Sequence, residues 1–233
     1  MSTAAARPAT RAVFFDVDFT LIHPGPAFQG AGYRDFCARH GIVVQPERFA
    51  EAVNAAAVLL DHSGGLYDPQ IFIDYTRRII ESMGGSGDRV EHAAREIYEE
   101  WSACHHFSLY DDVPEVLREL HSRGLTIGLI SNTQRCLSSF QSHFALDGLF
   151  TVTVSSAAHG HMKPHPSIFQ AALGQAGASP DEAVMVGDSP AHDIAGARAL
   201  GMRAVLVARD EARRVCPAGV PCITTLRDLP PLL

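Results

Sequence analysis

The chain of 233 residues has no long hydrophobic run. None of its apolar stretches approaches the roughly 18–20 residues that a helix needs to cross a bilayer. Its N-terminal stretch, MSTAAARPATRA, is small and polar and lacks the apolar centre of a secretory signal. We therefore expect no membrane partner and a cytoplasmic location.

Cysteine is scarce, and its spacing shows no pairing. The chain has 5 cysteines, an odd number, and no two of them form a CxxC motif. Scattered cysteines of this kind favour reduced thiols in a reducing compartment over a disulfide framework. The expectation of free thiols covers Cys37, Cys104, Cys136, Cys216 and Cys222.

The chain also has fewer basic than acidic residues. Lys and Arg together number 19 against 26 Asp and Glu, which gives a formal net charge of -7. Non-specific binding of nucleic acid needs basic patches, so we expect no nucleic-acid partner. A small anionic ligand remains open, because it needs only a local positive site.

What the chain does have is an alternation of short apolar strands with helices. Continuous apolar runs suit strands that are buried on both faces of a parallel sheet. Alternating strands and helices indicate right-handed βαβ units. The predicted fold class is therefore α/β, a doubly wound, Rossmann-like parallel sheet. The expected strands are 13–17, 125–130, 150–155, 183–187 and 203–208, and the expected helices between them are 112–124, 133–144, 166–176 and 191–200.

A long helical segment interrupts this alternation after the first strand. Residues 25–107 carry helix signals and little that indicates a strand. We expect a discontinuous α/β core, residues 1–24 and 108–233, with a helical cap domain at 25–107 inserted between its parts. Such an insert lies over the strand ends, where open α/β sheets place their ligands.

Polar residues follow the predicted strands at their carboxyl ends. Asp16 and Asp18 close the first strand, although it costs several kcal/mol to bury a carboxylate without a partner. The sequence SNT, which begins at Ser131, follows the second strand, Lys163 follows the third, and GDSPAHD, which contains Asp188, follows the fourth. Parallel strands end on one rim of the sheet, so these clusters are expected to converge on one crevice.

These motifs, in this order, carry a resemblance. DVDFTL is similar to the DxDxT signature of the haloacid dehalogenase-like hydrolases, and LISN, KPHPSIF and GDSPAHDIAGARALGM resemble that superfamily's later motifs. The match covers the whole core, and the insert resembles the helical cap of phosphatase-type members. The resemblance implies a Mg²⁺-dependent phosphatase that acts on a small phosphorylated metabolite.

The residues suit that chemistry. Phosphate esters repel an attacking anion, so a site must neutralise charge and position a nucleophile. Asp16 is the expected nucleophile, which forms an aspartyl-phosphate. Asp18, on the same side of the chain, is the expected general acid and base. The phosphate oxygens are expected to meet Thr20, Ser131, Asn132 and Lys163.

An all-oxygen site of carboxylates suits Mg²⁺. By resemblance, its ligands are the Asp16 carboxylate, the Asp18 main-chain carbonyl and the Asp188 carboxylate. Asp193 is expected to support the metal's water shell or Lys163, or to bind the metal directly.

Other functions fit the sequence less well. A dehalogenase also uses a nucleophile at Asp16, but it needs neither a leaving-group acid nor Mg²⁺. A phosphonate-cleaving relative needs a lysine in the cap, and residues 25–107 contain none. A non-catalytic binding or regulatory module keeps the fold but loses a motif residue, and here Asp16, Asp18, Asp188 and Lys163 are all present.

The histidines are ambiguous. His159, His161 and His165 invite a zinc site, although no cysteine is near. His105 and His106 fit better as a hydrogen-bonded or solvated junction at the return from the insert.

Phe19 stands where many relatives have glycine, and we expect an ordinary negative φ there. The expected substrate-facing residues are Phe28, Tyr33 and the loop 61–67, whereas Trp101 reads as core. The sequence leaves the substrate open among sugar phosphates, phosphoglycolate, nucleotides and pyrophosphate. It also leaves open whether the protein is a monomer or a homodimer.

Overall fold

The structure is a computed structural model, and it describes residues 9–61, 65–210 and 215–233. Its strands are β1 (Ala12–Phe15), β2 (Ile22–Pro24), β3 (Phe107–Leu109), β4 (Thr126–Ser131), β5 (Val152–Ser155), β6 (Ala183–Gly187), β7 (Arg203–Val207) and β8 (Cys222–Ile223). Its α-helices are α1 (Gly30–Arg39), α2 (Phe49–Ala56), α3 (Val58–Asp61), α4 (Pro69–Ser82), α5 (Val90–Glu100), α6 (Val113–Ser122), α7 (Leu137–His143), α8 (Ser156–His159), α9 (Pro166–Ala176) and α10 (Ala195–Ala199). A π-helical turn, Pro190–Ile194, leads into α10.

The main sheet has six strands in the order β5-β4-β1-β6-β7-β8. Every neighbouring pair in it is parallel. The central strand β1 pairs with β4 and β6, so that Ala12 lies opposite both Thr126 and Ala183. The predicted α/β fold class with a parallel, doubly wound sheet is therefore confirmed.

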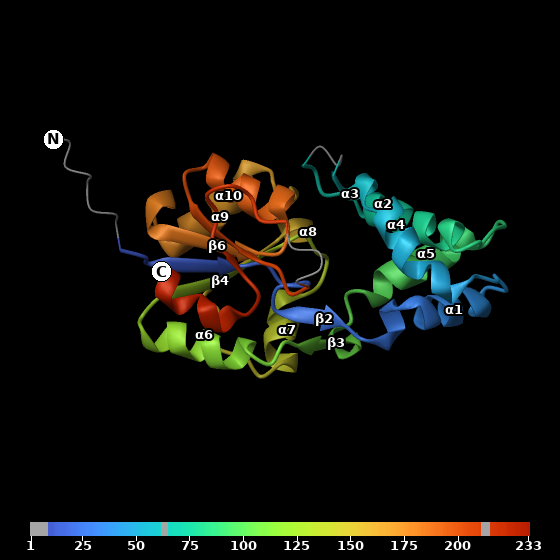
Figure 1. Ribbon diagram of the computed structural model, residues 1–233, viewed down its shortest axis with the longest axis horizontal. Coiled ribbons are helices and arrows are strands. Elements are labelled where there is room, and N and C mark those ends of the chain that lie inside the picture. Colours follow the sequence, from blue (N-terminus) through green and yellow to red (C-terminus); the bar gives the residue numbers. More distant parts are fainter. Residues whose placement is uncertain (1–8, 62–64, 211–214) are drawn as a thin grey trace.

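Helices cover both faces of the sheet, as the alternation along β1 requires. Val13 and Phe15 pack on the side of α6 and α7, whereas Ala12 and Phe14 pack on the side of α9 and α10. All four residues have no exposed surface. Figure 1 shows the same three layers, with α6 and α7 below the sheet and α9 and α10 above it.

The helical insert, residues 25–107, contains α1 to α5 and lies beyond the carboxyl ends of the strands, on the right in Figure 1. The antiparallel pair β2 and β3 carries the chain into and out of it. A second link joins the insert to the core: Leu66 forms a bridge with His161, and the Tyr67 N–H donates to the Gly160 carbonyl at 3.0 Å. The predicted domain boundaries fall within the β2–β3 pair, and the division into two domains stays a prediction.

Several predicted elements match closely, and one differs in an informative way. Helix α9 and strand β6 have the predicted bounds. Helix α7, predicted from residue 133, begins only at Leu137. Residues 132–136 instead form a loop at the end of β4, because Arg135 in this loop is bound to Asp18 and to the Trp101 carbonyl. Tertiary contacts thus override local helix preference here.

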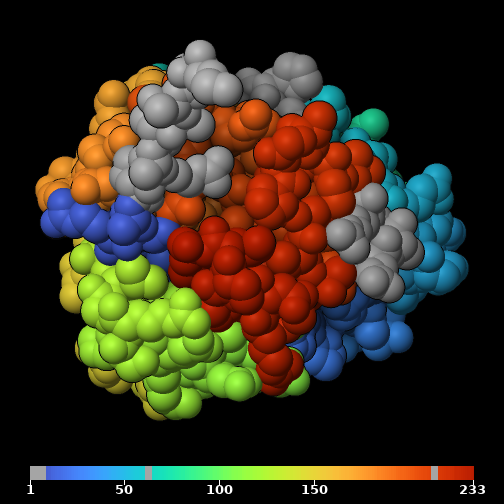
Figure 2. All heavy atoms as spheres, turned by 60° about the vertical axis from the view of Figure 1, so that its left-hand side comes forward, coloured from blue at the N-terminus to red at the C-terminus, as the bar shows by residue number. Residues whose placement is uncertain are grey.

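The C-terminal residues pack beside α6, as the red and green surfaces in Figure 2 show. Asp112 anchors them by accepting hydrogen bonds from the Thr225 hydroxyl at 2.6 Å and the Leu226 N–H at 2.7 Å. In this region Cys216 and Cys222 form a disulfide.

The prediction of reduced thiols is wrong for this pair. A tight turn, in which the Val220 N–H donates to the Pro217 carbonyl, brings the two cysteines to a Cα–Cα distance of 5.9 Å. Cys37, Cys104 and Cys136 are free. Disulfides are typical of oxidising compartments, so one argument for a cytoplasmic location is lost. Within the described parts of the chain, every helix is too short or too polar to cross a bilayer.

Candidate active site

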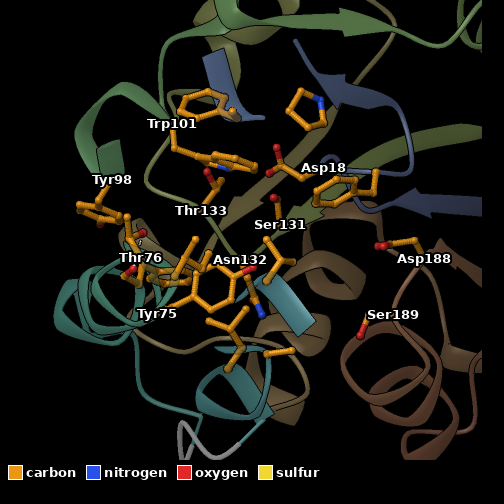
Figure 3. A pocket seen from close by; sticks show the side chains of 18 of the residues that line it. Asp18, Tyr75, Thr76, Tyr98, Trp101, Ser131, Asn132, Thr133, Asp188 and Ser189 are labelled. Atoms are coloured by element: carbon orange, nitrogen blue, oxygen red, sulfur yellow. Dashed lines mark hydrogen bonds between the residues drawn. The ribbon is translucent and has the colours of Figure 1, made fainter. Parts of the chain in front are cut away.

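The predicted site residues converge at the carboxyl ends of the strands. Asp16 and Asp18 follow β1, and Ser131 ends β4. A single cavity of about 600 Å³ lies between this rim and the helical insert. Its walls include almost all of the predicted site residues: Asp16, Asp18, Ser131, Asn132, Lys163, Asp188 and Asp193. Figure 3 shows that Asp18, Ser131, Asn132, Asp188 and Ser189 all surround this space.

Lys163 is the electrostatic centre of the site and the only lysine of the chain. Its Nζ lies 2.6 Å from Asp16 Oδ1 and 2.7 Å from Asp193 Oδ1, and it donates to the Ile130 carbonyl at 2.7 Å. Burial lowers the pKa of Lys163, but the charges of the two aspartates outweigh it and raise that pKa above its ordinary value. The lysine is therefore a fixed positive charge.

Asn132 positions this lysine through its backbone. The Asn132 Oδ1 accepts a hydrogen bond from the Lys163 N–H at 2.7 Å, and its Nδ2 donates to the Lys163 carbonyl at 3.0 Å. Both hydrogen-bonding groups of the asparagine side chain thus hold the loop that carries Lys163 against the end of β4.

Three carboxylates form a compact negative cluster. Oxygens of Asp16, Asp188 and Asp193 lie within 4.8 Å of one another. Burial raises the pKa of Asp16 to about 6, against the opposing effect of Lys163. Burial, together with the charges of Asp16 and Asp193, raises the pKa of Asp188 well above its ordinary value. The cluster holds more negative charge than Lys163 alone can balance, so it offers hard oxygen ligands to a cation.

Asp18 has a different partner, which the sequence did not reveal. Arg135 Nη1 donates to Asp18 Oδ1 at 3.0 Å and to Oδ2 at 3.2 Å, and its Nη2 donates to the Trp101 carbonyl at 2.7 Å. Its guanidinium also lies over the Phe107 ring, 4.5 Å from the centroid. Burial raises the pKa of Asp18, and Arg135 opposes that rise. Arg135 therefore joins the acid to the last turn of the insert.

The turn after Asp18 corrects one expectation and separates Thr20 from the others. Phe19 has φ of 63°, so the predicted ordinary φ is wrong. The chain must reverse tightly there, because the Phe19 N–H donates to the Ile22 carbonyl at 2.7 Å. Thr20 is fully buried and does not line the cavity, and its hydroxyl has no hydrogen-bond partner among the described residues. Of the predicted phosphate-binding residues, Thr20 is the one that lies apart.

The predicted zinc cluster and the histidine pair at the return from the insert differ in geometry. In the described part of the chain, His159, His161 and His165 do not bring three ligand atoms together, whereas His105 and His106 do so with Glu100 on the surface. His165 caps α9, since its Nδ1 accepts from the Ser167 N–H at 3.3 Å. His106 Nε2 lies 3.0 Å from Glu100, as expected for a hydrogen-bonded junction.

The helical insert supplies the opposite wall of the cavity. Phe28 and Tyr33, which are predicted to face the substrate, line it, and so does Trp101, for which the sequence indicates only a core position. Of the predicted loop 61–67, residues 62–64 lie outside the described part of the chain. Figure 3 shows Tyr75 and Tyr98 from the insert across the cavity from Asp188.

A parallel α/β sheet with two acids after its central strand, and with a lysine and further acids on neighbouring strand ends, is an arrangement typical of enzymes with a carboxylate at the site. Comparison with known proteins gives the family. The chain belongs to the haloacid dehalogenase-like hydrolases, whose family model matches residues 10–201.

Individual relatives agree with this assignment. The human haloacid dehalogenase-like hydrolase domain-containing protein 3 is 31% identical over 219 residues, which cover 89% of this chain and 86% of that protein. A phosphoserine phosphatase from Thermus thermophilus is 32% identical over 139 residues, 57% of this chain and 53% of its own length. The HAD-hydrolase YfnB from Bacillus subtilis, solved with bound magnesium, has the same fold, with a TM-score of 0.76, 18% identity and coverage of 97% and 99%. Structures with this fold include phosphatases and dehalogenases alike.

Proposed function

We propose that the protein is a Mg²⁺-dependent phosphatase that hydrolyses a small phosphorylated metabolite through an aspartyl-phosphate on Asp16. The observation that carries the proposal is the Asp16 carboxylate, fixed by Lys163 at 2.6 Å at the end of the central strand, with a second carboxylate, Asp18, on the wall of the same cavity. A haloacid dehalogenase-like hydrolase with phosphatases among its relatives fits this chemistry.

The acid cluster fits a magnesium ion. Its ligands would be the carboxylates of Asp16 and Asp188 and the main-chain carbonyl of Asp18. Asp193 would support these ligands indirectly. It pairs with Lys163, and the Oδ2 of Asp193 accepts a hydrogen bond from the Ser189 N–H at 3.0 Å. When bound, Mg²⁺ supplies positive charge that neutralises the carboxylates and the phosphate oxygens.

In the first step, an ionised Asp16 oxygen attacks phosphorus while the bond from phosphorus to the ester oxygen breaks. The departing oxygen takes the proton of Asp18, so the product leaves as a neutral alcohol. The raised pKa of Asp18, which burial causes, favours the protonated acid that this step needs. Lys163 and Ser131 bind the phosphate oxygens as charge moves onto them.

In the second step, water attacks the phosphorus of the aspartyl-phosphate. Asp18, now ionised, takes a proton from the water, and the bond from phosphorus to Asp16 breaks to release inorganic phosphate. Asn132 acts indirectly, because it holds the backbone of Lys163. The insert acts as a cap that excludes bulk water from the aspartyl-phosphate. Thr20 would support the site from behind the cavity. A cytoplasmic location stays a prediction.

Two alternatives keep the same fold. A haloacid dehalogenase would use Asp16 on carbon and would need neither Asp18 nor the acid cluster. A non-catalytic regulatory protein would have no use for the fixed Lys163–Asp16 pair. Both are less favoured, because the site combines the two acids and the cluster in one cavity.

The decisive experiment measures phosphate release from phenyl phosphate with Mg²⁺ and with a chelator. Asp16→Asn should lower kcat by about 10³-fold or more, because the nucleophile is lost. Asp111→Asn is the matched control, since that carboxylate is 86% exposed on the core surface. Full activity of Asp16→Asn, or metal-free halide release from a 2-haloacid by the unmodified protein, would refute the proposal.

A further inference from the structure

The two walls of the cavity differ sharply in chemistry. The core wall carries the acids and Lys163. The wall from the helical insert is formed mainly by aromatic and aliphatic side chains, among them Phe49, Phe72, Tyr75, Tyr98 and Trp101. All five are half-buried, so each presents apolar surface to the cavity. A substrate whose phosphate lies against the core wall must place its leaving group against this second wall.

The described residues of the insert wall offer no lysine or arginine to a substrate. Among the described residues that line the cavity, Lys163 is the only lysine or arginine, and two aspartates already neutralise it. The arginines of the insert lie outside the cavity, where several form surface ion pairs: Arg39 with Glu96, Arg77 with Asp74, and Arg95 with Glu91.

Two polar groups on the insert wall, those of Thr76 and Tyr98, are engaged in contacts of their own. The Thr76 hydroxyl donates to the Phe72 carbonyl at 2.9 Å within α4. The hydroxyls of Tyr98 and Tyr67 hydrogen-bond to each other at 2.6 Å. Apolar side chains therefore predominate on this wall, and it suits apolar surface better than a chain of hydroxyl groups, as a sugar phosphate would present.

Phe19 adds further apolar surface to the cavity. It directly follows Asp18, has φ of 63°, and is 43% exposed at the cavity, 6.3 Å from the Trp101 ring. A bulky residue at positive φ is strained, and glycine would satisfy the turn without strain. Backbone strain of this kind clusters at functional sites. The chain keeps a large apolar side chain beside the proposed general acid, where the leaving group must pass.

We propose that the leaving group is an uncharged, largely apolar alcohol with room for a ring, so that the substrates are aryl, arylalkyl or long alkyl phosphates. This inference rests on the proposed phosphatase function and narrows its substrate class. It disfavours leaving groups that carry a carboxylate or a phosphate. Such a group would lose its water against the insert wall without gaining a cation, close to several carboxylates.

A matched pair of substrates tests the inference. Benzyl phosphate and 4-carboxybenzyl phosphate share the same primary leaving oxygen and differ in a single carboxylate. The unmodified protein with Mg²⁺ should have a kcat/KM for benzyl phosphate that is higher by about a hundredfold or more, because the carboxylate is desolvated without a partner. Phosphoserine and glycerol 3-phosphate extend the comparison to charged and hydroxylated leaving groups.

Two variants locate the preference in the cavity. Phe19→Gly should lower kcat/KM for benzyl phosphate about tenfold more than for glycerol 3-phosphate, because it removes apolar contact. Its thermal midpoint should not fall, since glycine adopts this φ freely. Tyr75→Arg places a cation on the insert wall and should reduce the discrimination against the carboxylate about tenfold or more. Val43→Ala is the matched control, because Val43 is 86% exposed on the insert outside the cavity.

The outcomes separate the two proposals. Equal turnover of both benzyl esters, abolished by Asp16→Asn, would overturn the inference and leave the phosphatase function standing. A preference for benzyl phosphate that neither Phe19→Gly nor Tyr75→Arg changes would also overturn it, because the insert wall would not be its source. If no ester releases phosphate in a manner sensitive to Asp16→Asn, both proposals fall.

Discussion

The two walls of one cavity are built on different principles. On the core wall, charged groups are fixed by short contacts to one another, such as Lys163 with Asp16 and Asp193. On the insert wall, uncharged rings contact each other, for example Phe72 and Tyr98 at 6.0 Å between centroids. In the proposed function, the core wall binds the phosphate, which all substrates would share. The insert wall is suited to the leaving group, in which substrates differ.

The consequence is that changes on the two walls should have separable effects. Removing a fixed charge from the core wall should slow the reaction of every ester, because each ester presents the same phosphate. Changing a ring on the insert wall should alter the ratio between esters, because it alters only the apolar contact. Arg135 links the two parts, through Asp18 and the Trp101 carbonyl.

The largest effect is expected at Lys163. Lys163→Met should lower kcat/KM by about 10³-fold, because it removes the charge that binds phosphate and fixes Asp16. The loss should be the same for benzyl and 4-carboxybenzyl phosphate, and circular dichroism should show a folded protein. A loss confined to one ester would break the distinction between the walls.

Much of the core wall could be predicted from sequence, because its residues follow strands whose buried apolar runs are clear. Asp16 directly follows β1 and Asp188 directly follows β6, so predicting each strand from its local sequence also locates the acid after it. Arg135 was missed because residues 133–144 read as one helix. Only the contacts with Asp18 and Trp101, which are distant in sequence, hold Arg135 in a loop.

The insert wall could be predicted only in part, for a related reason. Aromatic residues at helical spacing indicate a buried face, whether that face meets core or substrate. Trp101 was therefore read as core, although it lines the cavity. The conformation of Phe19 was also missed, because side-chain identity predicts a negative φ and only the pairing of the turn with Ile22 imposes a positive one.

An intermediate effect is expected at Arg135, where the two walls meet. Arg135→Met should lower kcat/KM about 10²-fold, because Asp18 loses the partner that orients it. Arg135 opposes the rise in the pKa of Asp18, so its removal should raise that pKa further. The basic limb of the kcat/KM profile, which reports protonated Asp18, should then move to higher pH. Arg135→Lys should restore part of the rate and reverse part of the shift. An unchanged pH profile would mean that Arg135 only supports the fold.

The smallest effect concerns the stability of the core wall without metal. Burial raises the pKa of Asp16 from 3.8 to about 6, so the folded state binds this proton more tightly than the unfolded chain does. Its contribution to stability is complete below about pH 4 and is lost as the pH rises through about 6, a difference of about 3 kcal/mol.

Mg²⁺ binds the ionised carboxylates, so saturating Mg²⁺ should raise the thermal midpoint by about 5 °C more at about pH 7.5 than at about pH 5. Asp188→Asn should stabilise the metal-free protein at the higher pH and abolish most of this Mg²⁺-dependent rise, whereas Phe19→Gly should leave the rise intact. An equal rise at both pH values would show that the excess negative charge of the core wall is not what the metal neutralises.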